Sequence, residues 1–374
     1  MDFRLTPRQE ELKSSARALT EFIMKYELDC EENNGLPPHA HTEIRDAVLD
    51  SGLQAVNMPE EWGGAGLTIL EQVTVQAELG RLTGALWDMV WRPANALSFC
   101  TPEQRERYLV PVIRGQRRDC YAVSEPEAGS DPQSLRTTAT RTDGGWVLNG
   151  EKWFVTVGDH ADFMIVLAAA GEEGAPTLFL VDKETPGIEM TRVPRWMHTF
   201  VYEHPEFTFT DVRVPEDAVL GEVGKGYDIT RSWFTEERLM IAARTIGAAE
   251  RALELARNWA VERRQFGSPI ADFQLVQGSW SRACSPTARS TSPSTGPTPT
   301  RSPGRSTRAA PTARRCTPRR PSPSWRRARP PAASSTVACR SSAGAATTAR
   351  TPWSGSTANC ASTGSGRAPP RSSA

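Results

Sequence analysis

Four short segments of the chain carry residue types that could hold a ligand or move a proton. The first, YAVSEPEAGSD, runs from Tyr121 to Asp131 and gathers two serines, a proline and a glycine into a turn that follows a strand-like run. Such a turn could direct backbone N–H groups and hydroxyls toward a flat polar ligand. Its composition fits an ordinary surface turn at least as well, so the residues alone leave both interpretations open.

The second segment, NGEKWFVTVG, runs from Asn149 to Gly158 and is typical of a hairpin turn that leads into a strand. Because successive side chains of a strand point to opposite faces, Trp153 and Phe154 are expected on opposite faces. One ring could lie against a flat ligand while the other joins the core. Core packing of both rings is the plainer alternative.

The third and fourth segments add charged groups at the two ends of one predicted helix. Glu236, Glu237 and Arg238 stand near its start, in EERLMIAARTIGAAERAL, where acidic side chains usually only complement the helix dipole. Arg263 and Arg264 stand at its end, in VERRQFGSPIADFQ. Basic side chains there have the matching role, but they could also bind a pyrophosphate.

The elements that must position these segments can be read from the spacing of apolar residues. Helical spacing over residues 7–30, 41–53 and 68–82 predicts amphipathic helices in the first part of the chain. Short β-branched and aromatic runs, separated by turns such as TDGG and KETPG, predict an antiparallel β segment over about 120–215. From Trp233 a helical pattern continues for about thirty residues without proline. The predicted order is therefore helical, then β, then helical.

The balance of 44 basic and 44 acidic residues hides two unlike parts of the chain. Residues 1–278 hold all 44 acids and 28 bases, a net charge of −16, and are long enough to bury a large core. Residues 279–374 hold 16 Arg, no acid, and no Leu, Ile, Phe, Tyr or Met. Such a low-complexity basic tail cannot bury enough apolar surface to fold, which predicts disorder. An Arg-rich arm that binds nucleic acid is the alternative.

Several protein classes are excluded at this stage. No apolar run reaches the roughly 18 residues that a membrane helix needs, and the N-terminus lacks the apolar core of a signal peptide. Cys30, Cys100 and Cys120 are widely spaced, without a CxxC pair or the spacing of metal ligands. We therefore expect a reduced, cytoplasmic protein without a metal site.

In this order and spacing, the four segments and an earlier PEEWGGAGL run resemble the acyl-CoA dehydrogenase family. The resemblance covers about residues 5–278, and its most specific pieces are YAVSEPEAGSD and ERRQFG. It implies an α+β multidomain fold with an all-α N-terminal domain (1–119), an antiparallel, barrel-like β-domain (120–215) and a C-terminal four-helix-bundle domain. Residues 216–278 form the first part of that last domain.

The resemblance also implies ligands and partners. FAD is the implied cofactor, an acyl-CoA the substrate and an electron-transfer flavoprotein the electron acceptor. The family forms a homodimer or homotetramer in which a neighbouring subunit completes each flavin site. No membrane and no nucleic-acid partner is expected.

The family's flavin-contacting residues carry over onto matching positions. Ser124 resembles the hydroxyl near flavin N5 or O4, and Ser130 the one near the flavin phosphate or the acyl-CoA. Phe154 stands where the family often has Trp, and Thr156 matches a flavin-contacting hydroxyl. Val157 replaces a common Asn, which removes a polar contact. The implied cofactor-binding residues are Tyr121, Val123, Ser124, Ser130, Phe154, Thr156, Arg263 and Gln274.

The implied reaction removes the α-proton of the thioester while the β-hydride passes to the flavin, which gives the trans-2-enoyl-CoA. Arg238 resembles an arginine near the substrate, and Arg263 and Gln274 resemble residues that reach a neighbour's FAD. The base is usually the Glu of a [WY]-E-G-T-S motif, which the chain as written lacks. Glu237 aligns with the place where a minority of the family carries its base, so it is the catalytic candidate. A structural acid at a helix start is the alternative.

The tail resembles a displaced reading of the family's C-terminal domain. With permitted codons shifted by one base, Trp353–Ser372 reads VERLYRELRVDRIWEGTSEI, and a stretch that begins at Ser324 reads LASSEAAGRVVDRGVQIFGG. The missing Glu would span the codons of Gly366 and Arg367. We therefore expect a frameshift near residues 278–282 that leaves the C-terminal domain truncated or out of frame and the chain as written inactive.

Two other functions remain open on the sequence. The chain could be a catalytically dead remnant that binds flavin or acyl-CoA, or a dehydrogenase-like body with a basic nucleic-acid-binding tail.

Overall fold

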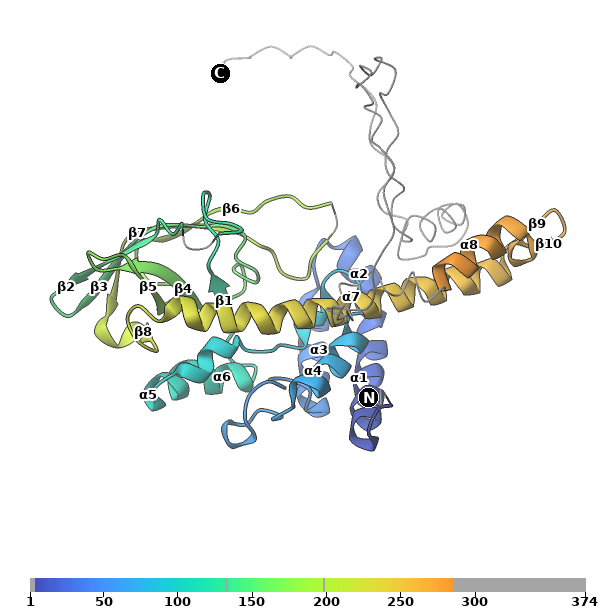
Figure 1. The fold of residues 1–374 in the computed structure, drawn as a ribbon, viewed down its shortest axis with the longest axis horizontal. Coiled ribbons are helices and arrows are strands. Elements are labelled where there is room, and N and C mark those ends of the chain that lie inside the picture. The colour runs from blue at the N-terminus through green and yellow to red at the C-terminus, as the bar shows by residue number, and fades with distance from the viewer. Residues whose placement is uncertain (1–3, 132–133, 198, 285–374) are drawn as a thin grey trace, which may run out of the picture. The chain divides into compact units, whose positions relative to one another are not determined.

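The computed structural model of the protein describes residues 4–131, 134–197 and 199–284. These residues follow the predicted order of helices, then a sheet, then helices (Figure 1). They fall into two compact units, one that extends to Arg251 and a second that begins at Ala252. The predicted disordered tail lies outside the described residues, except that Ser279–Cys284 continue the last helix.

Helices build the N-terminal part of the first unit. Thr6 and Thr68 each cap a helix, because the hydroxyl accepts the N–H three residues on while Gln9 or Glu71 bonds back to the threonine N–H. The helix predicted over 7–30 is interrupted by a 3₁₀ turn. The helices are α1 (Pro7–Ile23), α2 (Glu27–Glu32), α3 (Pro38–Ser51), α4 (Ile69–Leu79), α5 (Pro102–Gln104) and α6 (Val110–Ile113).

The strands form one mixed sheet in the order β6-β7-β3-β2-β4-β5-β8, with β1 also paired to β4. Most neighbours are antiparallel, as predicted, but β1 and β2 run parallel to successive lengths of the same edge of β4. The path of described strands is open at both ends, so it closes no barrel. The strands are β1 (Asp119–Ala122), β2 (Thr138–Thr142), β3 (Gly145–Lys152), β4 (Phe163–Ala170), β5 (Ala175–Asp182), β6 (Ile188–Arg192), β7 (Glu206–Pro215) and β8 (Val219–Leu220).

Strand β4 separates two apolar clusters because its side chains alternate between the faces of the sheet. Phe163 and Ile165 belong to the larger cluster, which includes the buried side chains of the N-terminal helices. Met164 and Val166 belong to a second cluster with Trp146 and other side chains of β3 and β7. The helices therefore cover one face of the sheet, and the sheet's own strands enclose the other cluster.

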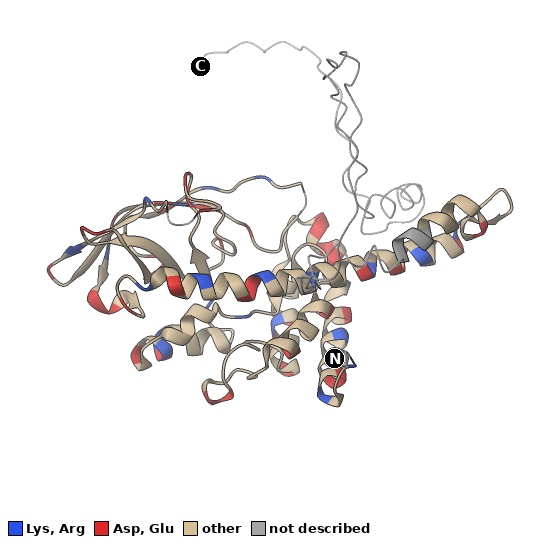
Figure 2. Cartoon of the chain, in the orientation of Figure 1, with Lys and Arg blue, Asp and Glu red and all other residues tan. Residues whose placement is uncertain are grey.

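Helix α7 (Gly226–Glu262) begins before the predicted start at Trp233. Two glycines allow it to pass close to the end of α4. A Cβ added at Gly247 would lie 1.8 Å from the Ala77 carbonyl oxygen, and one at Gly80 would lie 2.2 Å from that of Arg244. Acidic and basic residues alternate along α7 rather than forming a run of one sign (Figure 2).

The second unit continues α7 into a small hairpin and one more helix. Strands β9 (Arg264–Gln265) and β10 (Ser268–Pro269) pair antiparallel, and α8 (Gln274–Cys284) follows. Phe266 and Phe273 meet edge to face, with ring centroids 6.1 Å apart.

Candidate functional site

The turn after β1 carries the first group of predicted site residues. In this turn Glu125 and Ala128 exchange backbone hydrogen bonds of 3.0 and 3.2 Å. Val123 is buried, Ser124 is half-buried and Ser130 is exposed. The turn is therefore closed on itself while its two serines reach the surface.

The second group lies just after β3, which ends at Lys152. The strand predicted through Phe154 and Thr156 is therefore wrong. The chain leaves the ladder because the Trp153 N–H bonds the Ser124 carbonyl at 2.8 Å, and Phe154 then adopts a φ of +55° in the left-handed region. This hydrogen bond brings the two groups together, with the Phe154 ring 50% exposed and Thr156 exposed.

Three hydroxyls on these segments remain unengaged. Within the described residues, no side-chain hydrogen bond uses Ser124, Ser130 or Thr156. On the second segment the Phe154 ring is half-exposed, and a Cβ added at Gly129 of the turn would meet no atom within 4 Å. An exposed flat ring, free hydroxyls and open space at Gly129 fit a planar ligand with a polar edge.

Tyr121 connects the turn to α7. Its ring stacks on Trp233 with centroids 4.3 Å apart and planes inclined by 14°. The Thr230 hydroxyl donates to the Gly226 carbonyl at 2.8 Å, so the Tyr121 hydroxyl is the donor across the 3.0 Å to Thr230 Oγ1. Burial raises the pKa of the Tyr121 phenol, which keeps this donor protonated. The Tyr121 hydroxyl thus bonds Thr230 of α7 and does not donate to a ligand.

A buried ion pair lies beneath both segments. Lys152 Nζ is 2.6 Å from Glu125 Oε1, and the two side chains are 0% and 1% exposed. The Glu125 carboxylate also accepts the N–H groups of Arg136 and Thr137, at 2.6 and 3.1 Å. Burial alone would raise the pKa of Glu125, but Lys152 and these donors hold that pKa below its ordinary value. Burial lowers the pKa of Lys152 to about 8, against the opposing pull of Glu125.

Glu237, the predicted catalytic candidate, belongs to a cluster of four charged side chains. Arg92 pairs with both Glu236 and Glu237, and the Arg244 guanidinium lies 3.6 Å from the second oxygen of Glu237. Asn95 donates to Glu236 across 2.7 Å. Burial lowers the pKa of Arg92. Two guanidinium groups therefore engage the Glu237 carboxylate, an arrangement that fits a structural acid better than a free base.

The remaining predicted residues lie further along the chain. Arg238 is exposed, and its guanidinium lies 5.8 Å from the centroid of the Phe234 ring. In the second unit, Arg263 lies over the Trp259 ring at 5.9 Å, and its carbonyl accepts the Ile270 N–H at 2.8 Å. Gln274 is the exposed first residue of α8.

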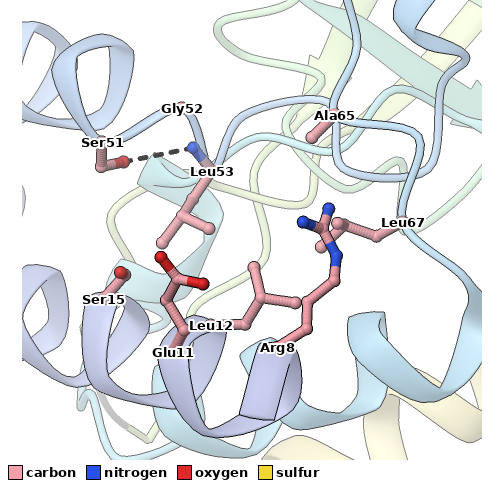
Figure 3. A pocket seen from close by; sticks show the side chains of 9 residues that line it. All are labelled: Arg8, Glu11, Leu12, Ser15, Ser51, Gly52, Leu53, Ala65 and Leu67. Carbon is pink, nitrogen blue, oxygen red and sulfur yellow. Dashed lines mark hydrogen bonds between the residues drawn. The ribbon is translucent and has the colours of Figure 1, made fainter. Parts of the chain in front are cut away.

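Two surface hollows of the first unit are not lined by any predicted site residue. One, of about 220 Å³, lies between α1 and the chain after α3, where the Ser51 hydroxyl accepts the Leu53 N–H at 3.2 Å (Figure 3). The other, of about 710 Å³, is lined in part by Trp62, whose ring lies 4.0 Å from the Arg105 guanidinium. Neither hollow brings the site residues together.

The part of the chain that the structure describes holds no group of three His, Cys, Asp or Glu side chains that could bind a metal ion. None of the described helices is long and apolar enough to cross a membrane.

Sequence reasoning missed the charged residues that hold this region together. Arg92 stands among apolar and small neighbours in VWRPA, whereas Lys152 and Glu125 each have an acidic residue close by, in GEKWFV and SEPEA. For Arg92 a charge within an apolar run was the available signal, because a buried charge needs a partner elsewhere in the fold.

Three family models match the chain. The acyl-CoA dehydrogenase N-terminal domain matches residues 6–116, the middle domain residues 120–212 and the C-terminal domain residues 224–283. Among curated proteins, benzylmalonyl-CoA dehydrogenase of Aromatoleum aromaticum is 34% identical over 284 residues, which cover 74% of each chain. The mitochondrial 2-methylacyl-CoA dehydrogenase of Solanum tuberosum is 33% identical and covers 73% of this chain and 68% of its own.

Solved structures give the same result. Butyryl-CoA dehydrogenase of Megasphaera elsdenii is similar with a TM-score of 0.68 and 29% identity, over 75% of this chain and 76% of its own. A chain from work on the electron transferring flavoprotein of Acidaminococcus fermentans has a TM-score of 0.69, 29% identity and the same coverage. The FAD complex of PigA has a TM-score of 0.67 and 25% identity over 75% of both chains.

Proposed function

The chain belongs to the acyl-CoA dehydrogenase family of oxidoreductases, and from this premise we propose that it catalyses the FAD-dependent α,β-dehydrogenation of an acyl-CoA thioester to the trans-2-enoyl-CoA. FAD, when bound, accepts the β-hydride. The chain's own residues bind and orient the two reactants and take the α-proton. The observation that carries the proposal is the joining of the turn after β1 to the segment after β3 through Trp153 and Ser124.

On this proposal the unengaged hydroxyls face the flavin. Ser124 and Thr156 would bond its polar edge, Phe154 would offer an apolar face to the ring system, and Tyr121 and Val123 would form the wall of the turn. Ser130 reaches the flavin phosphate or the acyl-CoA. The fit is supported by the lack of any competing partner for the three hydroxyls within the described residues.

Two arginines and a glutamine, on α7 and after it, complete the proposed site. Arg238 binds the substrate, where its exposed guanidinium is open to a thioester or phosphate group. Arg263 and Gln274 reach the FAD of a neighbouring subunit in a homodimer or homotetramer. We further propose an electron-transfer flavoprotein as the acceptor, with support from the structural likeness to the chain from Acidaminococcus fermentans work. A cytoplasmic location is proposed because Cys30, Cys100 and Cys120 are unpaired, as in a reducing compartment.

The base of the reaction is proposed to come from the displaced frame of the tail. The positions of Arg92 and Arg244 around Glu237 leave that carboxylate engaged at both oxygens. The C-terminal family model stops matching at residue 283, next to the proposed frameshift at 278–282. In the restored frame, the Glu that spans the codons of Gly366 and Arg367 is the base, and Glu237 is the alternative.

Two measurements test this proposal. The DNA of the gene around codon 278 should show a displaced frame that, once restored, encodes WEGTSEI. The correctly framed protein should then bind FAD and convert an acyl-CoA to its 2-enoyl product. FAD binding without turnover would support the remnant instead, and a correctly framed protein that binds no FAD would contradict the proposal.

A further inference from the structure

Lys152, the last residue of β3, and Trp153, which follows it, hydrogen-bond to three consecutive residues of the turn after β1. Lys152 Nζ donates to the Val123 carbonyl at 3.2 Å and to Glu125 Oε1 at 2.6 Å. The Trp153 N–H donates to the carbonyl of Ser124, which lies between them, at 2.8 Å. Hydrogen bonds from Lys152 and Trp153 therefore hold Ser124 and both of its chain neighbours in place.

The Glu125 carboxylate extends this connection to the start of β2. It accepts the N–H groups of Arg136 and Thr137, and the Thr137 hydroxyl donates to the Glu151 carbonyl at 3.2 Å. A Cβ added at Gly150 would lie 2.6 Å from Thr137 Cα, so the glycine permits this close approach. One ion pair thus links the turn, the end of β3 and the start of β2.

A buried ion pair of this kind adds little net stability compared with apolar side chains of the same shape. Both members are buried and bonded to backbone groups of the three segments, so a shift of any one segment would leave a buried charge without a partner. The effect of the pair is therefore expected in the placement of the segments more than in the stability of the sheet.

We propose that Lys152 and Glu125 are a positioning pair that sets the placement of Ser124 relative to Phe154 and Thr156, and through it the affinity and electronic environment of bound FAD. This inference rests on the proposed function. Neither side chain touches the flavin; each acts through the backbone of the turn.

The test compares two double variants of the full chain, in the reading frame that the gene's DNA establishes. The Lys152→Met/Glu125→Gln variant removes both charges while it keeps an acceptor for the backbone N–H groups. The Arg141→Met/Glu216→Gln variant is the control, because it removes an exposed 2.7 Å pair from the same domain. For each protein we would measure the melting temperature, the FAD dissociation constant, and the visible circular dichroism and midpoint potential of the bound flavin.

The first variant is expected to fold, to bind FAD about tenfold more weakly, as the loss of one hydrogen bond from a displaced Ser124 implies, and to show a changed flavin spectrum and potential. The control should match the parent in all four measurements. A Lys152→Met/Glu125→Gln variant with the parent's affinity, spectrum and potential would overturn the inference. Failure of that variant to fold would overturn it too, because the pair would then support the whole domain. A parent that binds no FAD contradicts the proposed function itself.

Discussion

The turn after β1 and the second half of α7 differ in how fully the described residues pair their charged groups and bury their apolar side chains. In the turn, the Glu125 carboxylate is buried, paired with the Lys152 ammonium of β3 and bonded to backbone N–H groups, and Lys152 also donates to the Val123 carbonyl. Along the end of α7 and beyond it, apolar side chains stand in solvent among the described residues. Leu255 is 45% exposed, Val261 59%, Leu275 87% and Phe266 97%.

This contrast separates a region whose buried charges are paired from a region whose apolar side chains are exposed. The buried Glu125 and Lys152 find all their hydrogen-bond partners within residues 120–215. An apolar helix face is normally buried against other helices, as in a bundle. On the proposed frameshift, the helices that would cover this face are encoded in the displaced frame of the tail.

The largest expected effect comes from restoring that frame. The chain as written should aggregate and show no measurable turnover, because apolar side chains at the end of α7 are exposed among the described residues. The frame-restored chain should be soluble and active. Size-exclusion chromatography and steady-state assays with an acyl-CoA and an electron-transfer flavoprotein make the comparison. If the chain as written were soluble and fully active, α7 would need no further helices to bury its apolar residues.

The next effect concerns the base. In the frame-restored protein, changing the WEG glutamate to glutamine should lower turnover by roughly 10²–10⁴, the range for a positioned general base, without loss of FAD. Glu237→Gln should lower turnover much less, since Arg92 and Arg244 already engage that carboxylate. The reverse ranking would assign the base to Glu237 and leave the chain as written with its catalytic group.

A smaller effect compares a buried with an exposed ion pair. Lys152→Met alone leaves Glu125 buried without its counter-ion, which should lower the free energy of unfolding by about 3–5 kcal/mol. Arg141→Met removes one member of an exposed pair and should cost about 0–1 kcal/mol. Urea unfolding of both variants measures the difference. If both variants lost the same free energy of unfolding, the buried pair would stabilise the turn no more than the exposed pair stabilises the surface.

The smallest expected effect concerns the crossing of α4 and α7. Gly247→Ala would push a methyl group into the Ala77 carbonyl, so it should destabilise by about 1–3 kcal/mol. Gly278→Ala in α8 meets no atom within 4 Å and should stabilise its helix by about 0.5–1 kcal/mol. Thermal unfolding of the two variants shows the sign. A neutral Gly247→Ala variant would mean that the helices can separate at this point.

Periodicity predicted the order of the elements, because helix and strand spacing are local properties. It placed α3 and α4 within a few residues and found the β segment. It missed the parallel pairing of β1 and β2 with β4, since register between strands depends on contacts far apart in the chain. It also carried a strand through Phe154, where the Trp153–Ser124 hydrogen bond turns the backbone.

The assignment of the candidate site residues stays a prediction from motifs. The two segments that hold Ser124 and Thr156 were expected to act together, and in the structure Trp153 and Lys152 bond the turn at Val123, Ser124 and Glu125. The ion pairs of Lys152 and Arg92 were not predicted, because each partner lies in a segment whose distance in space the sequence does not give.

Anaerobic addition of an acyl-CoA to the FAD-loaded, frame-restored protein tests the central claim most directly. The proposed reaction predicts that the visible absorption of the flavin bleaches as the thioester loses its α-proton and β-hydride, and that 2-enoyl-CoA forms in equal amount. A correctly framed protein that holds FAD and whose flavin stays oxidised with short, branched, aromatic and long acyl-CoA substrates would contradict it.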